Sequence, residues 1–507
     1  MLDNPEDVIE ASMRLYGVQT TERTDFDTLR LYATGEQAFP LVVPSDAPRE
    51  VRELARTSRI NLIAIIINSL VESLFLDGMR TTSPGVGDEL PAGVVPNLDP
   101  GAGGGDEDVM SPIWRVLQKN RFDKKQGGLY RAVFTYGFGY AVATPGRSGL
   151  PVVRPVSPRK MTAMYDPTDP DYPVEAVERL TDGTYRYYEA YNGEAAMWRL
   201  AYDRDSKRLG FMTAEPTPLG LDYVPVIKYV NADDLDLDDE PLSQALRGSE
   251  RNRVDVVAGQ VAPVMTLQDQ TDISSFALKS AEWYTAFRQR WVKGWIPENR
   301  SVRMKMGASQ VWTFEEHPDD IELGEFSETS LEGFLRSRES VLKYAATLSQ
   351  TPVHELIGEL VNLSAEALAA AEAGRDRKVG LAKVCLGESH EQLAETIGMY
   401  VGVEVPETME AVWKDTSARA FAAVIDGLGK VAQMLQVPPE MLWDRIPGVT
   451  RQDVIRWKEA AKQGDSLAAL TKMLEGQANP GGGAPVANPD GSTTRPSGLV
   501  VPAGART

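Results

Sequence analysis

The side chains best suited to acid–base chemistry or metal binding in this sequence are three histidines and many carboxylates. His317, His354 and His390 lie far apart along the chain. A glutamate follows His354, as in the HExxH motif of zinc proteases, but Gly358 stands where the second histidine ligand would be. The sequence therefore predicts no catalytic residue and no metal site. Its scattered carboxylates leave one alternative open, a metal-dependent DNA-processing enzyme such as a nuclease.

Three further stretches have the residue types of ligand-binding loops but not the required spacing. Gly137 and Gly139 lack the third glycine of a dinucleotide fingerprint, and Gly427-Leu-Gly429-Lys430 lacks the upstream glycine of a P-loop. In the acidic run Asp233 to Glu240, a calcium loop starting at Asp234 would need glycine at Asp239 and glutamate at Ala245. We therefore expect no cofactor, and we interpret the acidic run as a solvated linker.

Aromatic and basic side chains alternate before residue 294. Phe276, Trp283, Phe287 and Trp291 are interleaved with Lys279, Arg288, Arg290 and Lys293, which is the mixture that single-stranded nucleic acid binds. Aromatic residues spaced by four positions on one helix are more typical of a core or a subunit interface. We therefore expect the set Trp283, Phe287, Arg288, Arg290 and Trp291 to form an interface.

Composition and charge narrow the class of protein further. The 507 residues suffice for about three domains. Lys and Arg number 53 against 73 Asp and Glu, so the net charge of -20 argues against a surface built to grip nucleic acid non-specifically. Cys385 is the only cysteine, which excludes an intrachain disulfide and favours a reducing compartment. The N-terminus does not resemble a signal peptide, and the apolar run Ile60 to Leu76 contains too many polar residues to span a bilayer, so we expect a soluble intracellular protein.

The chain is organised around a loop between two helices. The first helix should start near Thr329, where Glu332 three residues later indicates a capping box, and Leu331 to Leu348 should give it one apolar face. Pro352 and Gly358 then predict a functional loop over Gln350 to Leu363, with one helical turn at most. From Ser364 an Ala-Leu-Glu-rich helix should run to Val401, and its internal glycines predict a bend or close packing.

The rest of the chain is predicted to alternate helical and β-rich parts. Residues 5–80 should be mostly helical, with Arg59 to Met79 buried on most of its circumference, and Thr81 to Asp108 should be a mobile connector. Trp114 to Pro145 should pass from helix to strand. Pro151 to Tyr229 should form a meander with hairpins at Asp182-Gly183 and Asn192-Gly193. Residues 241–290 should form two helical segments separated at Asp269-Gln270, and VWTF at 311–314 should be a strand. Short helices should follow from Met409, and Gly476 to Thr507 should be disordered.

The sequence TLSQTPVHELIG...VNLSAEAL resembles the sequences of the portal proteins of tailed bacteriophages. The stretch EWYTAFRQRW and the spacing of Trp114, Asn120, Phe122 and Asp123 before Tyr136 resemble them too. The resemblance implies an α+β portal fold with a mixed wing, a helical stem, a small clip, a long kinked helix and a helical crown. The implied domains are a wing at 1–240 with its β-rich part at 151–230, first stem helices at 241–290, a clip at 291–327, a second stem helix at 328–349, a tunnel loop at 350–363, a long kinked helix at 364–402, a crown at 403–475 and a disordered tail at 476–507.

The resemblance also implies a function and a set of partners. Such proteins form a ring of twelve copies at one capsid vertex, through which double-stranded DNA is packaged and ejected without sequence recognition. Implied partners are the terminase large subunit, a head-tail adaptor and the major capsid and scaffolding proteins, in the virion and in the host cytoplasm during assembly, with no membrane. The implied channel contacts come from tunnel-loop residues that carry no positive charge: Gln350, His354, Glu355, Glu359 and Asn362.

Overall fold

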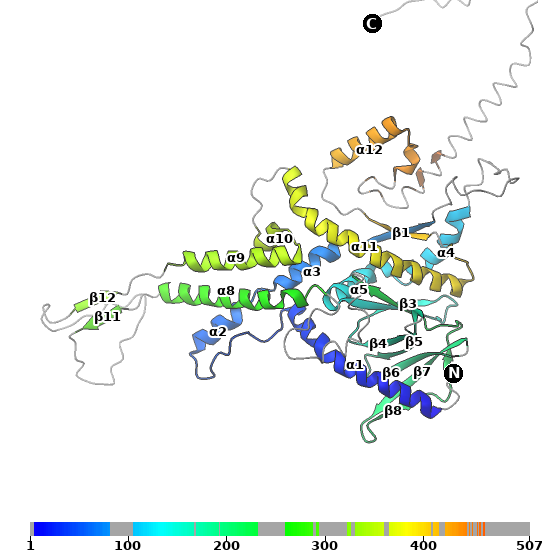
Figure 1. The fold of residues 1–507 in the computed structure, drawn as a ribbon, viewed down its shortest axis with the longest axis horizontal. Coiled ribbons are helices and arrows are strands. Elements are labelled where there is room, and N and C mark those ends of the chain that lie inside the picture. The colour runs from blue at the N-terminus through cyan, green and yellow to red at the C-terminus, as the bar shows by residue number, and fades with distance from the viewer. Residues whose placement is uncertain are drawn as a thin grey trace, which may run out of the picture. The chain divides into compact units, whose positions relative to one another are not determined.

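The computed structural model describes most of the chain, in segments separated by gaps. The described residues are 5–81, 105–166, 169–191, 193–231, 259–286, 290–293, 322–325, 330–358, 365–406, 409–414, 421–443, 446, 449, 454, 456–457 and 460–461. Two compact units, Met1–Ala418 and Arg419–Thr507, are described separately below. Figure 1 shows helices and small sheets side by side in the first unit, which confirms the predicted α+β class.

The N-terminal part of the chain is helical as far as Glu72. It contains α1 (Pro5–Thr34), α2 (Arg49–Thr57) and α3 (Leu62–Glu72). The side chain of Asn61 caps α3, because its oxygen accepts a hydrogen bond from the Ala64 N–H at 3.0 Å. Leu76–Thr81 is a strand, β1, so the prediction that residues up to 80 continue the helical pattern is wrong after Glu72.

One segment of the described chain, Arg49–Glu72, is long and apolar enough by composition to cross a membrane, with a mean hydropathy of 1.3. Half of this apolar window is buried inside the protein. Ile63, Ile66 and Leu70 of α3 belong to the largest apolar cluster of the first unit, so the hydropathy of α3 serves the core.

A helix-to-strand passage follows the predicted connector. It consists of α4 (Gly105–Lys119), α5 (Phe122–Tyr136) and β2 (Phe138–Thr144), as the sequence predicts. Gly137 makes the turn possible, since its φ of 92° lies in the left-handed region. The connector predicted over Thr81 to Asp108 is shorter than expected, because its last four residues already belong to α4; residues 82–104 lie outside the described part.

Two antiparallel sheets follow, and they confirm the predicted β-rich meander. β2 is the central strand of a sheet ordered β10-β2-β3, with β3 at Val152–Val156 and β10 at Val226–Val230. The second sheet is ordered β4-β5-β6-β7-β8, with β9 paired to β7. Its strands are β4 (Met161–Asp166), β5 (Asp169–Arg179), β6 (Tyr185–Tyr191), β7 (Glu194–Asp203), β8 (Arg208–Phe211) and β9 (Thr217–Pro218). Gly183 and Gly193, at the two predicted hairpins, have φ of 84° and 77°.

Two long helices, α8 (Met265–Ala286) and α9 (Glu332–Ser349), pack side by side (Figure 1). The predicted break at Asp269-Gln270 is wrong, because α8 runs through it. Asp269 instead accepts a hydrogen bond from the Tyr32 hydroxyl at 3.0 Å, so this polar residue joins α8 to α1. The predicted capping box at the start of α9 is also wrong: its N-cap is Leu331, without a side-chain cap, and Thr329 lies outside the described residues.

A small antiparallel ladder lies between these two helices in sequence. It pairs β11 (Arg290–Lys293) with β12 (Glu322–Glu325), in the stretch predicted as the clip. Arg290 and Trp291 therefore belong to a strand, and the prediction that the aromatics up to Trp291 share one helix is wrong. The predicted strand at 311–314 lies outside the described residues.

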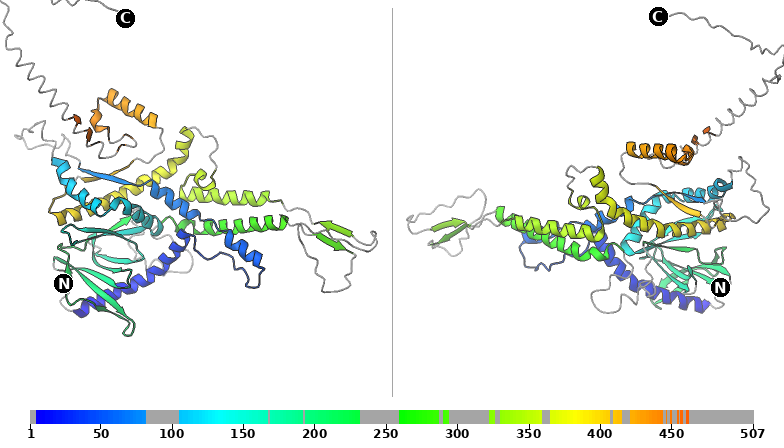
Figure 2. Two further views of the ribbon diagram at one scale, coloured as in Figure 1. Left: turned by 180° about the vertical axis from the view of Figure 1, so that it is seen from behind. Right: turned by 45° about the horizontal axis from the view of Figure 1, so that its top comes forward.

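The long helix α11 spans Ala365–Val401, close to its predicted bounds. Figures 1 and 2 show that its axis bends, as the internal glycines predict. A Cβ on Gly398 would lie 2.6 Å from Val405 Cγ2, so this glycine permits a close return of the chain after the helix. Cys385, the single cysteine, is half-buried in α11.

The stretch predicted to open the helical crown begins instead with a strand. Met409–Trp413 forms β13, which pairs antiparallel with β1 and so belongs to the first unit. The expected helix starting at Met409 is therefore wrong at its beginning. In the second unit, α12 (Phe421–Leu435) and a 3-10 turn (Pro439–Met441) agree with the prediction of short helices separated by prolines. The tail predicted to be disordered, Gly476 to Thr507, lies outside the described residues.

A buried chain of hydrogen bonds centred on His390 joins four elements of the first unit. His390 of α11 lies 2.8 Å from the Tyr130 hydroxyl through Nε2 and 3.0 Å from the Tyr229 hydroxyl through Nδ1. Tyr130 donates to Gln126 Oε1 at 3.1 Å, and this oxygen also accepts from the Leu76 N–H of β1 at 2.8 Å. Because Tyr130 gives its only hydroxyl proton to Gln126, we assign the His390 proton to Nε2.

The environment of His390 keeps its imidazole neutral. The side chain is fully buried, and its ring lies against the rings of Phe122 and Trp413. Burial lowers the pKa of His390 to about 3. His390 is thus a structural residue that holds α11 against α5 and β10.

A pH-dependent contribution to stability is expected at Glu22 of α1. Burial is the main cause that raises its pKa to about 7, and the Thr162 hydroxyl donates to its carboxyl group at 3.0 Å. A folded-state pKa above the unfolded value means that this stabilisation is complete below pH 4.5 and is lost as the pH rises through 7.

We predict that Glu22→Gln changes stability little at pH 4.5 and raises the free energy of unfolding by about 2 to 3 kcal/mol at pH 8. Urea unfolding of both proteins at the two pH values measures the difference. Equal stabilities at pH 8 would show that the carboxyl group is better solvated than the structure indicates.

Candidate functional site

The segment that joins α9 to α11 is held in a defined conformation by its own sequence. Gln350, just after α9, has a φ of 57° in the left-handed region, and the Thr351 N–H donates back to the Ala346 carbonyl at 3.1 Å. The Ser349 hydroxyl donates to the Ala345 carbonyl at 2.7 Å and lies 3.0 Å from the Thr351 hydroxyl. Pro352 then cannot continue the helix, so the chain turns sharply here.

A one-turn helix, α10 (Val353–Ile357), occupies the centre of this segment, as the sequence predicts. Its Leu356 is buried and belongs to the main apolar cluster. Gly358 ends the turn with a φ of 78°, a conformation that strains other residues. The first half of the segment is therefore a packed part of the fold.

Two cations of α11 fasten this segment from the other side. Arg375 forms an ion pair with Glu355 at 2.5 Å and another with Glu372 at 3.3 Å. Lys378 donates to the Ser349 carbonyl at 2.9 Å, at the negative end of the α9 dipole. Burial lowers the pKa of Lys378 to about 8, so this contact weakens as the pH rises above that value.

The structure places some of the predicted channel residues and leaves others undescribed. Gln350 is exposed and His354 is half-buried, so both retain access to solvent. Glu355, another of the implied channel contacts, forms an ion pair with Arg375, which compensates its charge. Glu359 and Asn362 lie outside the described residues. The assignment of this loop to a DNA channel stays a prediction.

The predicted interface residues do not form one helical face. Trp283 is in α8 and 43% exposed, whereas Arg290 and Trp291 are in β11. The ring of Trp291 covers Gly324 of β12, where an added Cβ would come within 2.3 Å of it. Phe287 and Arg288 lie outside the described residues. Their role at an interface between subunits stays a prediction.

Sequence reasoning missed how the apolar side chains of α9 divide between two faces. Val341, Leu342 and Ala345 are buried, but Tyr344 is 63% exposed and Leu348 is 52% exposed. Tyr344 and Leu348 are four residues apart and thus neighbours on the outer face of the helix. The prediction of a single apolar face is therefore wrong. The spacing in the sequence could have indicated this second face, since Tyr344 and Leu348 are one helical turn apart and do not fall in line with the buried residues.

Other exposed apolar side chains lie on the elements that follow α9. Val353 of α10 is 41% exposed, and Leu381 and Val384 of α11 are 58% and 63% exposed.

Within the described ranges, no group of three or more His, Cys, Asp or Glu side chains is placed to hold a metal ion. The nuclease alternative therefore gains no support from these residues.

The order of elements agrees with the portal fold that the sequence resemblance implies: sheets and helices, then two packed helices, a short loop helix and a long bent helix. Residues 20–466 match the family of phage portal proteins described as SPP1 Gp6-like, and the chain belongs to this family. It is thus a bacteriophage portal protein, a structural component of the head-tail connector.

Two solved structures are similar to this chain. A chain described as "Virion of native gene transfer agent (GTA) particle" is 14% identical, with 81% of this chain and 99% of that chain covered and a TM-score of 0.42. Another, described as "Neck of native GTA particle computed with C12 symmetry", is 12% identical, with 81% and 95% covered and a TM-score of 0.39. No curated protein matches this sequence.

Proposed function

We propose that this portal protein assembles into a closed ring at one capsid vertex, and that the ring is the channel for double-stranded DNA. The observation that carries the ring is the exposed apolar pair Tyr344 and Leu348 on α9, a helix whose opposite face is already packed. Side chains of this size stabilise a contact when they are removed from water. A head-to-tail contact whose rotation closes gives a ring.

The oligomeric state of the full chain tests this proposal directly. Light scattering or native mass spectrometry of the purified protein should show one species, whose mass is a fixed high multiple of the chain mass. Twelve copies are the number that the resemblance to portal proteins implies. Monomers or dimers alone, over a wide concentration range, would overturn the ring.

Inside the ring, the loop Gln350 to Leu363 lines the channel and touches DNA weakly. This loop contains no lysine or arginine, so it cannot form strong ion pairs with phosphate. Weak contact suits a channel through which DNA slides. Terminase, head-tail adaptors and the capsid and scaffolding proteins are the docking partners that family membership suggests, in the virion and during assembly in the host cytoplasm.

We predict that Glu359→Lys leaves ring assembly intact but slows DNA packaging, most strongly at low ionic strength, because attraction to phosphate is then least screened. Packaging rate and ring mass, measured at several salt concentrations, check this result. Glu355→Lys is a poorer probe, because it would also place a lysine beside Arg375 and disturb the fold. Packaging by Glu359→Lys rings at the wild-type rate at every salt concentration would show that the loop does not face DNA.

A further inference from the structure

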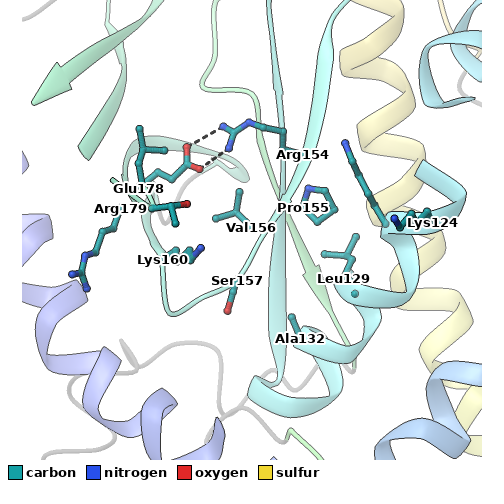
Figure 3. Close-up of a pocket in the computed structure, with 14 residues that line it drawn as sticks. Lys124, Leu129, Ala132, Arg154, Pro155, Val156, Ser157, Lys160, Glu178 and Arg179 are labelled. Atoms are coloured by element: carbon teal, nitrogen blue, oxygen red, sulfur yellow. Dashed lines mark hydrogen bonds and ion pairs between the residues drawn. The ribbon is translucent and has the colours of Figure 1, made fainter. Parts of the chain in front are cut away.

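A basic pocket lies beside β3, an edge strand of the sheet ordered β10-β2-β3, in a protein whose net charge is -20. Its volume is about 690 Å³. Four of its cationic side chains come from α5, from the turn before β4 and from the end of β5 (Figure 3): Lys124, Lys125, Lys160 and Arg179. The function proposed above gives this pocket no role.

The four cations of the basic pocket are not neutralised within the chain. Glu178 is the one carboxylate among the described residues that line the pocket, and it is already paired. Arg154 donates to it in two hydrogen bonds of 2.6 and 3.0 Å, and Arg186 donates to it at 3.4 Å. In the part of the chain that the structure describes, no carboxylate forms an ion pair with any of the four cations. Burial and the charges of Arg154 and Arg121 lower the pKa of Lys125, so the cations of this pocket repel one another.

The second half of α11 carries the opposite charge. After Lys383 the helix contains no lysine or arginine and has three glutamates, which form its acidic face: Glu388, Glu391 and Glu395. Spacings of three and four residues place them on one side of the helix, where Glu388 and Glu395 are exposed. None of the three forms an ion pair with a described residue. Burial raises the pKa of Glu391, and the charges of Glu388 and Glu410 raise it further, so these carboxylates also repel one another.

The basic pocket and the acidic face lie toward opposite edges of one sheet. β3, which lines the pocket, is one edge strand of the order β10-β2-β3, and β10 is the other. The ammonium group of Lys125 donates to the Val153 carbonyl of β3 at 3.0 Å. The Ser389 hydroxyl of α11 donates to the Lys228 carbonyl of β10, also at 3.0 Å. The chain therefore presents cations at one edge of this sheet and carboxylates at the other.

We propose that the acidic face of α11 in one copy of the chain docks onto the basic pocket of the next copy. This contact rests on the ring proposed above, and it adds a second interface to the one at Tyr344 and Leu348. A ring built from head-to-tail contacts needs two different, complementary surfaces on each subunit. Opposite charges supply that complementarity here, and like charges prevent two copies from pairing through the same surface.

Reversal of the charge on each surface separately tests the contact in the full chain. The pocket variant is Lys124→Glu with Lys160→Glu, and the face variant is Glu388→Lys with Glu395→Lys. All four side chains are exposed, so neither change should harm the fold. At low ionic strength, each variant should need about tenfold or more protein for half of the chains to be in rings, because attraction at the contact becomes repulsion.

The salt dependence identifies this loss as electrostatic. Light scattering over a range of protein concentrations gives the half-assembly point of each protein at several salt concentrations. The difference between each variant and the wild type should shrink as salt is added, because ions screen the repulsion between the exposed charges. A difference that stays constant from low to high salt would contradict a contact made by these charges.

Combination of the two reversals distinguishes contact between the surfaces from damage to either one. A chain with all four substitutions has the wild-type net charge and again carries opposite charges on its two surfaces. It should therefore assemble within about threefold of the wild type. In an equimolar mixture of the pocket variant and the face variant, only unlike neighbours meet with opposite charges. Native mass spectrometry should find equal numbers of the two variants in each mixed ring.

A charge-matched control separates the contact from the effect of net charge. Arg204→Glu with Arg208→Glu changes the net charge as much as the pocket variant does. Both arginines are exposed at the hairpin between β7 and β8, outside the basic pocket and the acidic face. This control should assemble within about twofold of the wild type.

Four results would overturn the proposal. If both variants form rings as readily as the wild type, the ring stands and this contact does not. Equal loss of assembly in the control would reduce the effect to net charge. A chain with all four substitutions that assembles no better than either variant would show that the two surfaces do not meet. If a labelled DNA duplex binds wild-type rings but not rings of the pocket variant, and both assemble equally, the pocket binds phosphate instead. A wild-type chain that forms no ring would overturn the function proposed above together with this contact.

Discussion

Tyr344→Glu combined with Leu348→Glu is expected to abolish the ring and leave a folded monomer. Both side chains are more than half exposed in the single chain, so the change should cost little stability there. At an interface it would remove apolar surface and place two carboxylates in a region without water. We expect a loss of at least about 3 kcal/mol for each contact between subunits, or more than a hundredfold in the association constant.

Light scattering should then give the mass of one chain. The circular dichroism spectrum should stay that of a folded protein, and unfolding should remain cooperative. Leu41→Glu with Val42→Glu is a suitable control, because these residues are also exposed and apolar but lie in the loop before α2. That control should still form rings. Rings of unchanged stability in the α9 variant would show that the interface between subunits lies on another surface.

His390→Ala is expected to destabilise the first unit by about 3 to 5 kcal/mol at neutral pH. The imidazole is fully buried, so its removal leaves a cavity. It also deprives the Tyr229 hydroxyl and the Tyr130 hydroxyl of a hydrogen-bond partner at His390. Urea unfolding measures the loss, and His354→Ala, a change at a half-buried histidine, should cost less than about 1 kcal/mol.

His390 should also make the stability of the folded protein depend on pH in the acidic range. The folded pKa of His390, about 3, is below the unfolded value of 6.5, so the unfolded chain takes up a proton first. Between these values stability should fall by about 1.4 kcal/mol per pH unit as the pH is lowered. This component should be missing in His390→Ala. An identical pH dependence in both proteins would show that folding does not lower the pKa of His390.

These two predictions concern residues that the sequence presents very differently. Tyr344 and Leu348 lie in a helix that the sequence predicts, and only their exposure was missed. His390 appeared in the sequence as one of three isolated histidines, with no sign of the two tyrosines that bind it. Its partners come from positions 260 and 161 residues away, so no local pattern could indicate them.

Local interactions explain what the sequence determined by itself. The bounds of α11, the turn at Pro352, the short helix before Gly358 and the hairpin at Gly183 follow from helix propensity and from backbone conformations that few residues allow. Such preferences act over a few residues, so the structures that they favour can be predicted from the amino-acid sequence. The resemblance to portal proteins rests partly on this segment and is confirmed by the family match.

The tertiary structure alone decided which distant segments meet. Leu76–Thr81 is a strand because Met409–Trp413 pairs with it, and neither stretch has the alternation of a typical strand. Glu355 is neutralised by Arg375 of another helix. Hydrogen bonding between strands, ion pairing and burial depend on distance in space, and that distance is set only when the whole core has packed.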